Sequence, residues 1–106
     1  MERYDYDRPP LGDDLATGMG TALAQFNSAV FTGPGRIPRR YRELIAVAVG
    51  LTTQCTGCIS VHTRGALAQG ATADEIAEVT YITAAVRAGG ATAHGALSLS
   101  VAKRQH

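Results

Sequence analysis

Large aromatic side chains and cysteines are scarce in this 106-residue chain, which has no tryptophan, two phenylalanines and two cysteines. Long hydrophobic runs are lacking too. The longest apolar stretch, residues 44–51, is far short of the roughly 20 residues that a membrane span requires. The first residues also lack the apolar segment of a secretion signal. We therefore expect a cytoplasmic location and no membrane partner.

A strong excess of one charge is lacking as well, because the formal net charge is +1 and basic residues gather only between Arg36 and Arg42. Binding to phosphates requires a clustered cationic surface, so we expect no nucleic-acid partner. The 45% hydrophobic and 18% charged content is typical of a globular protein. The length predicts a single domain over residues 1–106, with the polar residues 1–10 as an N-terminal arm.

Small residues take the place of the missing aromatics, since the chain contains 18 alanines and 12 glycines. An alanine-rich core fills little volume per residue, so helices must approach one another closely and a monomer buries little surface. Association between copies would add the burial that the monomer lacks. This composition predicts a homo-oligomer.

Apolar residues recur at helical spacing through most of the chain, and no segment shows the alternation of a strand. Glycine, proline and capping residues divide the pattern, among them a Thr72-Ala73-Asp74-Glu75 capping box and two expected stops at Gly70 and Gly89-Gly90. The prediction is an all-α fold, a compact bundle of about five helices. Their expected bounds are Leu11 to the Gly33-Pro34-Gly35 segment, Pro38 to about Leu51, about Cys55 to Gln69, Thr72 to Gly89-Gly90, and about Ala91 to Lys103.

The third of these helices carries a group of residues with chemical potential: Cys55, Cys58 and His62. At about 100° per residue these positions fall within roughly 60° of one another, on one face. A histidine four residues from a thiol can accept its proton, and the thiolate is the reactive form. A second cysteine one turn away can then close a disulfide. Proximity to His62 favours Cys58 as the nucleophile, whereas a position at the helix start favours Cys55.

Other interpretations of these residues remain open. A C-x-x-C pair also suits zinc, but a closed zinc site needs four ligands, and only His62, His94 and His106 remain besides the two cysteines. We therefore predict neither a metal nor a cofactor. We expect His94 to be structural, and Tyr81 to be a core or interface aromatic.

Glu43 has two possible roles. If the second and third helices formed one straight rod, Glu43 would lie about 22 Å from Cys58 and would be an ordinary solvated carboxylate. It meets the cysteines only if the chain reverses at residues 52–54, where Thr52-Thr53-Gln54 interrupts the apolar pattern. The residues permit this reversal without requiring it.

Two segments together resemble the core of the carboxymuconolactone decarboxylase family, and within it the AhpD-like alkylhydroperoxidase branch. They are Arg42-Glu43-Leu44-Ile45-Ala46-Val47-Ala48-Val49-Gly50 and Cys55-Thr56-Gly57-Cys58-Ile59-Ser60-Val61-His62-Thr63. The shared pattern is a Glu, eleven residues, C-x-x-C, three residues and a His. Two residues depart from the family's usual choices. Position 57 is glycine here, where the family often has an aromatic residue or His, and position 53 is threonine, where the family often has Asn.

The resemblance implies an all-helical fold in which the Glu-bearing and Cys-bearing helices pack side by side. It implies that Glu43 and His62 form a proton relay that activates Cys58. Cys58 would then attack a hydroperoxide, and Cys55 would resolve the sulfenic acid to a disulfide. The implied partners are a hydroperoxide substrate, a dithiol reductant protein and further copies of the chain, as a trimer or hexamer.

The resulting hypothesis is a thiol-dependent peroxidase or disulfide oxidoreductase. One alternative is lactone decarboxylation, the reaction that names the family, although that branch does not rely on a C-x-x-C dithiol. The other alternative is a non-enzymatic, metal-binding oligomer.

Overall fold

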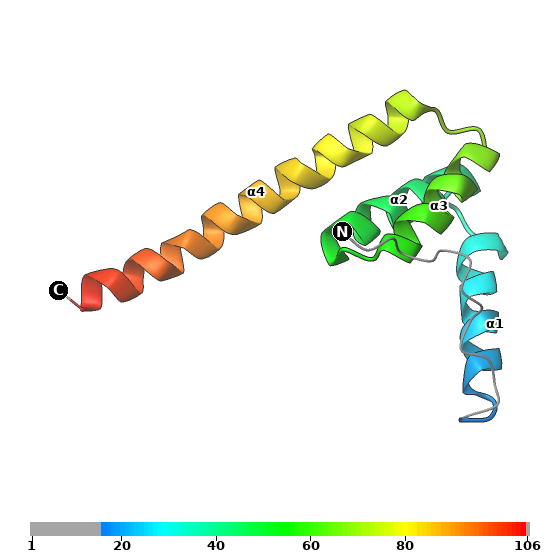
Figure 1. Cartoon of the computed structure of the whole chain (residues 1–106), viewed down its shortest axis with the longest axis horizontal. Coiled ribbons are helices and arrows are strands. Elements are labelled where there is room, and N and C mark those ends of the chain that lie inside the picture. The colour runs from blue at the N-terminus through cyan, green and yellow to red at the C-terminus, as the bar shows by residue number, and fades with distance from the viewer. Residues whose placement is uncertain (1–15, 106) are drawn as a thin grey trace.

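The computed structural model describes residues 16–105, and every regular element within them is a helix. In chain order the helices are α1 Met19–Thr32, α2 Arg39–Thr53, α3 Thr56–Ala68 and α4 Ala73–Arg104 (Figure 1). The all-α prediction is therefore confirmed. The predicted arm, residues 1–10, and the predicted helix start at Leu11 lie outside the described residues.

Helices α2 and α3 form an antiparallel pair that holds most of the buried contacts. α2 ends at Thr53, and the next residue, Gln54, has φ of 56° and ψ of 36°, in the left-handed region; α3 begins directly after Cys55. Gly50 lets the two helices come close, because a Cβ there would lie 3.3 Å from Cγ1 of Ile59 and 3.5 Å from Cβ of Cys58. The chain therefore does reverse where the apolar pattern is interrupted.

The core of this pair is small, as the alanine-rich composition predicts. Its buried apolar residues are Leu44, Val47, Ala66 and Ala71. Ile76 and Val79 of α4 pack against the cluster of Leu44, Ala66 and Ala71. The beginning of α4 therefore covers the α2–α3 pair.

The local signals before α4 operate as predicted. Thr72 caps the helix, with its hydroxyl accepting from the Glu75 backbone N–H at 3.1 Å, and the Glu75 carboxylate accepts from the Thr72 N–H at 3.0 Å. Gly70, with φ of 93°, makes the turn that follows α3. The connection between α3 and α4 therefore follows from residues 70–75 alone.

The predicted stop at Gly89-Gly90 is wrong. α4 is one helix of 32 residues that passes through both glycines, so the described residues contain four helices rather than about five. A glycine in the helix interior costs only about 1 kcal/mol relative to alanine. It does not block helical geometry as proline does. Two glycines can therefore lie inside α4 without ending it.

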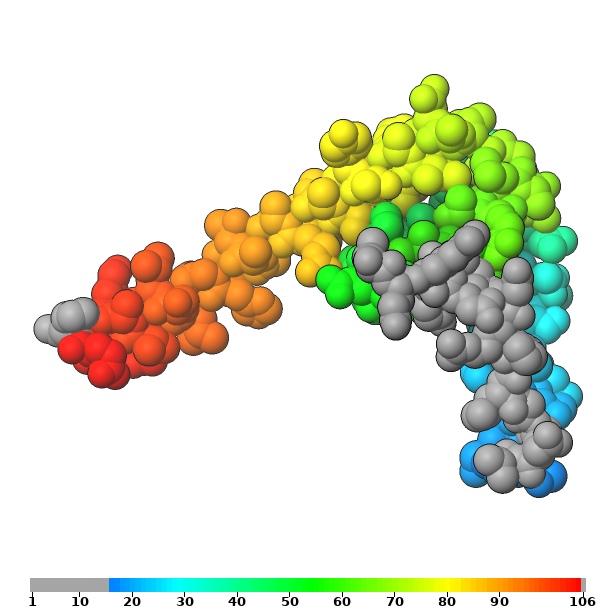
Figure 2. All heavy atoms as spheres, viewed as in Figure 1, coloured from blue at the N-terminus to red at the C-terminus, as the bar shows by residue number. Residues whose placement is uncertain are grey.

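The expected compact bundle is also wrong for the single chain. Its radius of gyration is 18.3 Å, against about 13 Å for a compact protein of this length. We call residues 88–104 the distal part of α4. Figure 1 shows α4 running away from the α2–α3 pair, and Figure 2 shows its distal part standing clear of the other helices. No helix in residues 16–105 combines the length and apolarity needed to cross a membrane.

Candidate active site

The two cysteines are joined in a disulfide at the start of α3. Cys55 is the residue that caps the helix, and its sulfur accepts a hydrogen bond from the backbone N–H of Cys58 at 3.3 Å. Cys55 is half-buried against the turn, whereas Cys58, one turn further on, is exposed. The predicted helix start near Cys55 is confirmed, and the pair is spaced for reversible disulfide chemistry.

Glu43 and His62 meet across the α2–α3 pair. Oε2 of Glu43 lies 2.7 Å from Nδ1 of His62, and the two side chains are only 15% and 19% exposed, respectively. The reversal at Gln54 brings them together although 19 residues separate them in the sequence. The view of Glu43 as a solvated surface carboxylate is therefore wrong.

The chemistry of this pair follows from its donors and acceptors. An ionised carboxylate can only accept hydrogen bonds, so Nδ1 of His62 donates to Glu43. In the neutral imidazole this leaves Nε2 with a free lone pair that can take a proton. Such a pair can hold the tautomer of a general base and stabilise the imidazolium formed when it accepts a proton.

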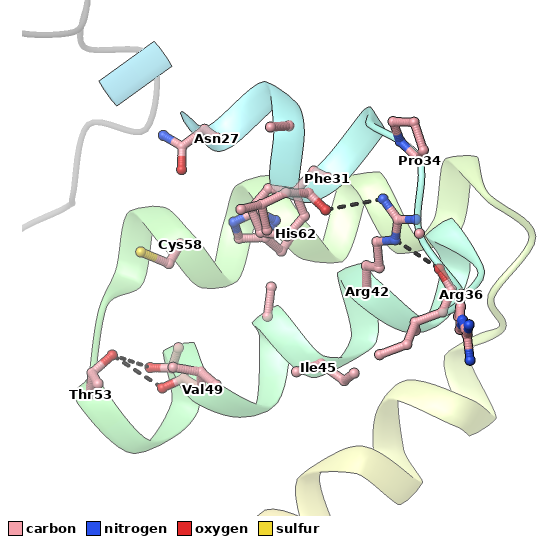
Figure 3. A pocket seen from close by; sticks show the side chains of 16 residues that line it. Asn27, Phe31, Pro34, Arg36, Arg42, Ile45, Val49, Thr53, Cys58 and His62 are labelled. Carbon is pink, nitrogen blue, oxygen red and sulfur yellow. Dashed lines mark hydrogen bonds between the residues drawn. The ribbon is translucent and has the colours of Figure 1, made fainter. Parts of the chain in front are cut away.

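Cys58 and His62 lie one turn apart on α3, as predicted, and both line the same pocket. In Figure 3, however, the sulfur of Cys58 points away from the His62 ring. This follows from the disulfide, because that sulfur is bonded to Cys55. Reduction would free the Cys58 side chain to rotate between its staggered positions.

Two residues of this site could not be found from the sequence pattern. Phe31, near the end of α1, lies against His62 with ring centroids 4.5 Å apart (Figure 3). Gly65 of α3 faces the Glu43 carboxylate so closely that an added Cβ would lie 2.7 Å from Cδ and Oε2. Phe31 is on a different helix and leaves no local signal. The only signal for Gly65 is a mid-helix glycine three residues after His62.

Arg42 holds α1 in the position that presents Phe31. Its Nη1 donates to the carbonyl oxygens of Val30 at 3.1 Å and Gly33 at 2.7 Å, and its Nε donates to the carbonyl of Ile37 at 2.7 Å. The guanidinium therefore ties the end of α1 and the following loop to α2. In the sequence it is only one member of the Arg36–Arg42 basic group.

A pocket of about 690 Å³ opens beside Cys58 and His62 (Figure 3). It lies between the end of α1 and the exposed face of α2, and its walls are mainly apolar. The lining includes Val30, Phe31, Ile37, Ile45, Ala46 and Val49. The pocket is therefore a mainly apolar space that opens at Cys58 and His62.

The remaining candidate residues lie elsewhere. His94 and Tyr81 are both exposed on α4, so Tyr81 is not a core residue of the single chain. His106 lies outside the described residues. Within residues 16–105, no three His, Cys, Asp or Glu side chains are grouped as metal ligands would be.

Comparison with known sequences identifies relatives and a family. A Paracoccus denitrificans protein named uncharacterized protein 4 in cox locus is 43% identical over 74 residues, which cover 70% of this chain and 67% of the relative. An uncharacterized protein of Cupriavidus necator is 34% identical over 70 residues, which cover 64% of this chain and 62% of the relative. The model of the carboxymuconolactone decarboxylase family matches residues 18–100, which include all four candidate residues. The chain therefore belongs to the carboxymuconolactone decarboxylase family.

Proposed function

We propose that this protein is a thiol-dependent peroxidase of the AhpD-like alkylhydroperoxidase type. The observation that carries the proposal is the combination of a Cys55–Cys58 disulfide with the Glu43–His62 hydrogen bond beside one apolar pocket. A dithiol supplies two electrons, the Glu–His pair accepts a proton, and the pocket holds the substrate. These are the parts that peroxide reduction by a thiol requires.

The proposed reaction has three steps. In the reduced protein His62 takes the proton of Cys58, and the thiolate attacks the outer peroxide oxygen, which breaks the O–O bond. Cys58 becomes a sulfenic acid and the alkoxide leaves as an alcohol after protonation. The thiol of Cys55 then displaces water from the sulfenic acid, which forms the disulfide. A dithiol partner protein reduces this disulfide by exchange and is itself oxidised to a disulfide.

Two observations support Cys58 as the cysteine that is attacked first. Cys58 is exposed and lines the pocket together with His62, whereas Cys55 is half-buried. Cys55 has the competing advantage of the helix start, where its sulfur already accepts a backbone N–H. We assign attack to Cys58 because substrate access and the general base occur together there, and resolution to Cys55.

Single-turnover chemistry separates these roles. The reduced wild type should consume an organic hydroperoxide repeatedly when a small dithiol is supplied. Cys58→Ser should stop consumption, whereas Cys55→Ser, reduced beforehand and freed of dithiol, should consume one equivalent and stop at the sulfenic acid, which mass spectrometry detects. Wild-type rates no faster than those of Cys58→Ser would contradict peroxidase activity. If the disulfide nevertheless exchanges rapidly with dithiols, the protein is a disulfide oxidoreductase.

Membership of the family favours lactone decarboxylation as the second candidate. Such a reaction needs a proton donor and an anion-binding group but no dithiol. Activity on a carboxylated lactone that survives alkylation of both cysteines would support it over peroxide reduction.

We also propose that the chain functions as a homo-oligomer, with the distal part of α4 covered by a second copy. The chain exposes 8424 Å², about half as much again as the roughly 5,700 Å² of a compact protein of 11.1 kDa. At 100° per residue, Val86, Leu97 and Val101 continue the face on which Val79 packs against the core. No Asp, Glu, Lys or Arg occurs from Ala88 to Ala102. A trimer or hexamer and a cytoplasmic location remain predictions.

A further inference from the structure

Gly65 occupies the middle of α3, where glycine is unfavourable and its special backbone freedom is not used. α3 runs from Thr56 to Ala68, and the left-handed glycines of the described chain are Gly18 and Gly70. Alanine would suit the same helical backbone better, because glycine loses more conformational freedom on folding. The advantage of glycine at this position is therefore that it has no side chain to fill the adjacent volume.

The atoms that fill this space belong to the Glu43 carboxylate. A Cβ on residue 65 would lie 2.7 Å from Cδ, 2.7 Å from Oε2 and 3.1 Å from Oε1. Oε2 is also the atom that accepts from Nδ1 of His62. His62 and Gly65 are three residues apart on α3, so they share the face that meets α2. The carboxylate lies over the bare backbone of Gly65 while it contacts the ring of His62.

We propose that Gly65 is a positioning residue for the Glu43–His62 relay, an inference that rests on the proposed peroxidase function for its chemical consequence. Any side chain at position 65 competes with the carboxylate for one volume. Because the carboxylate is the end of a flexible side chain, it moves before the helices do. The added methyl group therefore breaks the hydrogen bond to Nδ1 and leaves the α2–α3 pair folded.

Gly89 provides a matched control for the substitution. It is also inside a helix, and a Cβ built there meets nothing within 4 Å. Because distal α4 is proposed to contact a second copy, both glycine variants are made in a Leu97→Asp background, where Gly89→Ala should raise the melting temperature and leave the site unchanged. Gly65→Ala has the same gain in helix propensity but meets the Glu43 carboxylate. The difference between the two variants isolates the effect of that contact.

The first measurement is the tautomer of His62, followed by the imidazole ¹⁵N resonances in the reduced protein. Wild type and Gly89→Ala should hold the proton on Nδ1. Gly65→Ala should lose that preference, and alkylation of Cys58 at neutral pH in a Cys55→Ser background should slow by about three- to tenfold. If Gly65→Ala keeps the wild-type tautomer and alkylation rate, the inference is overturned.

The second measurement asks whether Gly65 acts through Glu43. In a Glu43→Ala background the obstructing carboxylate is gone, so Gly65→Ala should raise the melting temperature as much as Gly89→Ala does. It should cause no further loss of thiol reactivity, because residues that act through one contact are not additive. If Gly65→Ala unfolds the chain in both backgrounds, the glycine serves helix packing and the inference is wrong.

The outcomes separate this inference from the proposed function. A tautomer change in Gly65→Ala that Glu43→Ala reproduces supports the positioning role, even if no variant affects peroxide consumption. In that case the peroxidase proposal fails by itself. Conversely, full dependence of peroxide consumption on Cys58 with no tautomer change in Gly65→Ala would retain the peroxidase and exclude the positioning role.

Discussion

The α2–α3 pair and the distal part of α4, residues 88–104, are built from similar small residues but differ in what surrounds them. In the pair, Val47 is 2% and Ala66 0% exposed, whereas Leu97 in distal α4 is 64% exposed. Arg87, whose Nη1 donates to the Thr52 carbonyl at 2.8 Å, makes the last hydrogen bond from α4 to another described helix. The α2–α3 pair is thus buried by residues of its own chain, whereas distal α4 stays exposed in the single chain.

The glycines show what this difference means. In the pair, Gly50 allows close approach of α3, and Gly65 leaves room for Glu43. In distal α4, a Cβ added to Gly89, Gly90 or Gly95 meets nothing within 4 Å. An isolated helix with three glycines is marginal in water. Contacts within the chain therefore account for the glycines of the α2–α3 pair. No contact within the described chain accounts for the glycines of distal α4.

A charge placed inside the buried α2–α3 pair should produce the largest effect. Val47→Asp places a carboxylate among apolar atoms with no partner, which costs about 4 kcal/mol or more. Because a small domain has only about 5–15 kcal/mol of stability, most of the chain should unfold. Circular dichroism and a denaturant titration measure the loss.

Val61→Asp is the matched control, because Val61 is a half-exposed valine on the neighbouring helix α3. Its helical signal and denaturation midpoint should stay close to those of the wild type. Equal destabilisation by the two variants would mean that the packing within the α2–α3 pair does not govern folding.

Breaking the unenclosed region should change assembly. Leu97→Asp puts a charge on the continued apolar face of α4, so we expect the proposed oligomer to dissociate to smaller species while the Cys55–Cys58 site remains. Light scattering coupled to size-exclusion chromatography gives the mass. Leu99→Asp is the control, since Leu99 is equally hydrophobic and exposed but about 160° around the helix. A wild type that is monomeric at high concentration would refute the assembly proposal.

The same contrast explains how much could be predicted from the sequence. The capping box at Thr72, the helix start at Cys55 and the turn at Gly70 depend on neighbouring residues, and all three are confirmed. The stop at Gly89-Gly90 is wrong because glycine has only a weak preference against the helix interior, and this does not end a helix. The prediction of a compact bundle is wrong because composition indicates how little surface a chain can bury. It does not indicate how the helices are arranged.

The residues of the candidate site also differ in whether neighbouring sequence or contacts between helices group them. Cys55, Cys58 and His62 share one helix face, so their spacing alone groups them. Glu43 needs the reversal at Gln54, which the residues permitted and only the family resemblance implied. Phe31 and Gly65 are defined by contacts between helices. No periodicity within one segment reports such a contact, so neither could be predicted.

The smallest expected effect tests how far the enclosed region extends into α1. The Phe31 ring covers His62, so Phe31→Ala should admit water to the Glu43–His62 hydrogen bond and let the imidazole move. We expect Cys58 alkylation to slow by only about twofold to fivefold, because the proposed catalytic groups all remain, and we expect little change in fold.

The chain's other phenylalanine, Phe26, provides the control for this variant, since it is on the same helix but exposed. Phe26→Ala removes the same apolar volume without touching His62, so it should leave the alkylation rate unchanged. If both variants slow the reaction equally, the effect comes from loosening α1 as a whole. If only Phe31→Ala does, the ring itself holds the imidazole, and the enclosed region includes the end of α1 together with the α2–α3 pair.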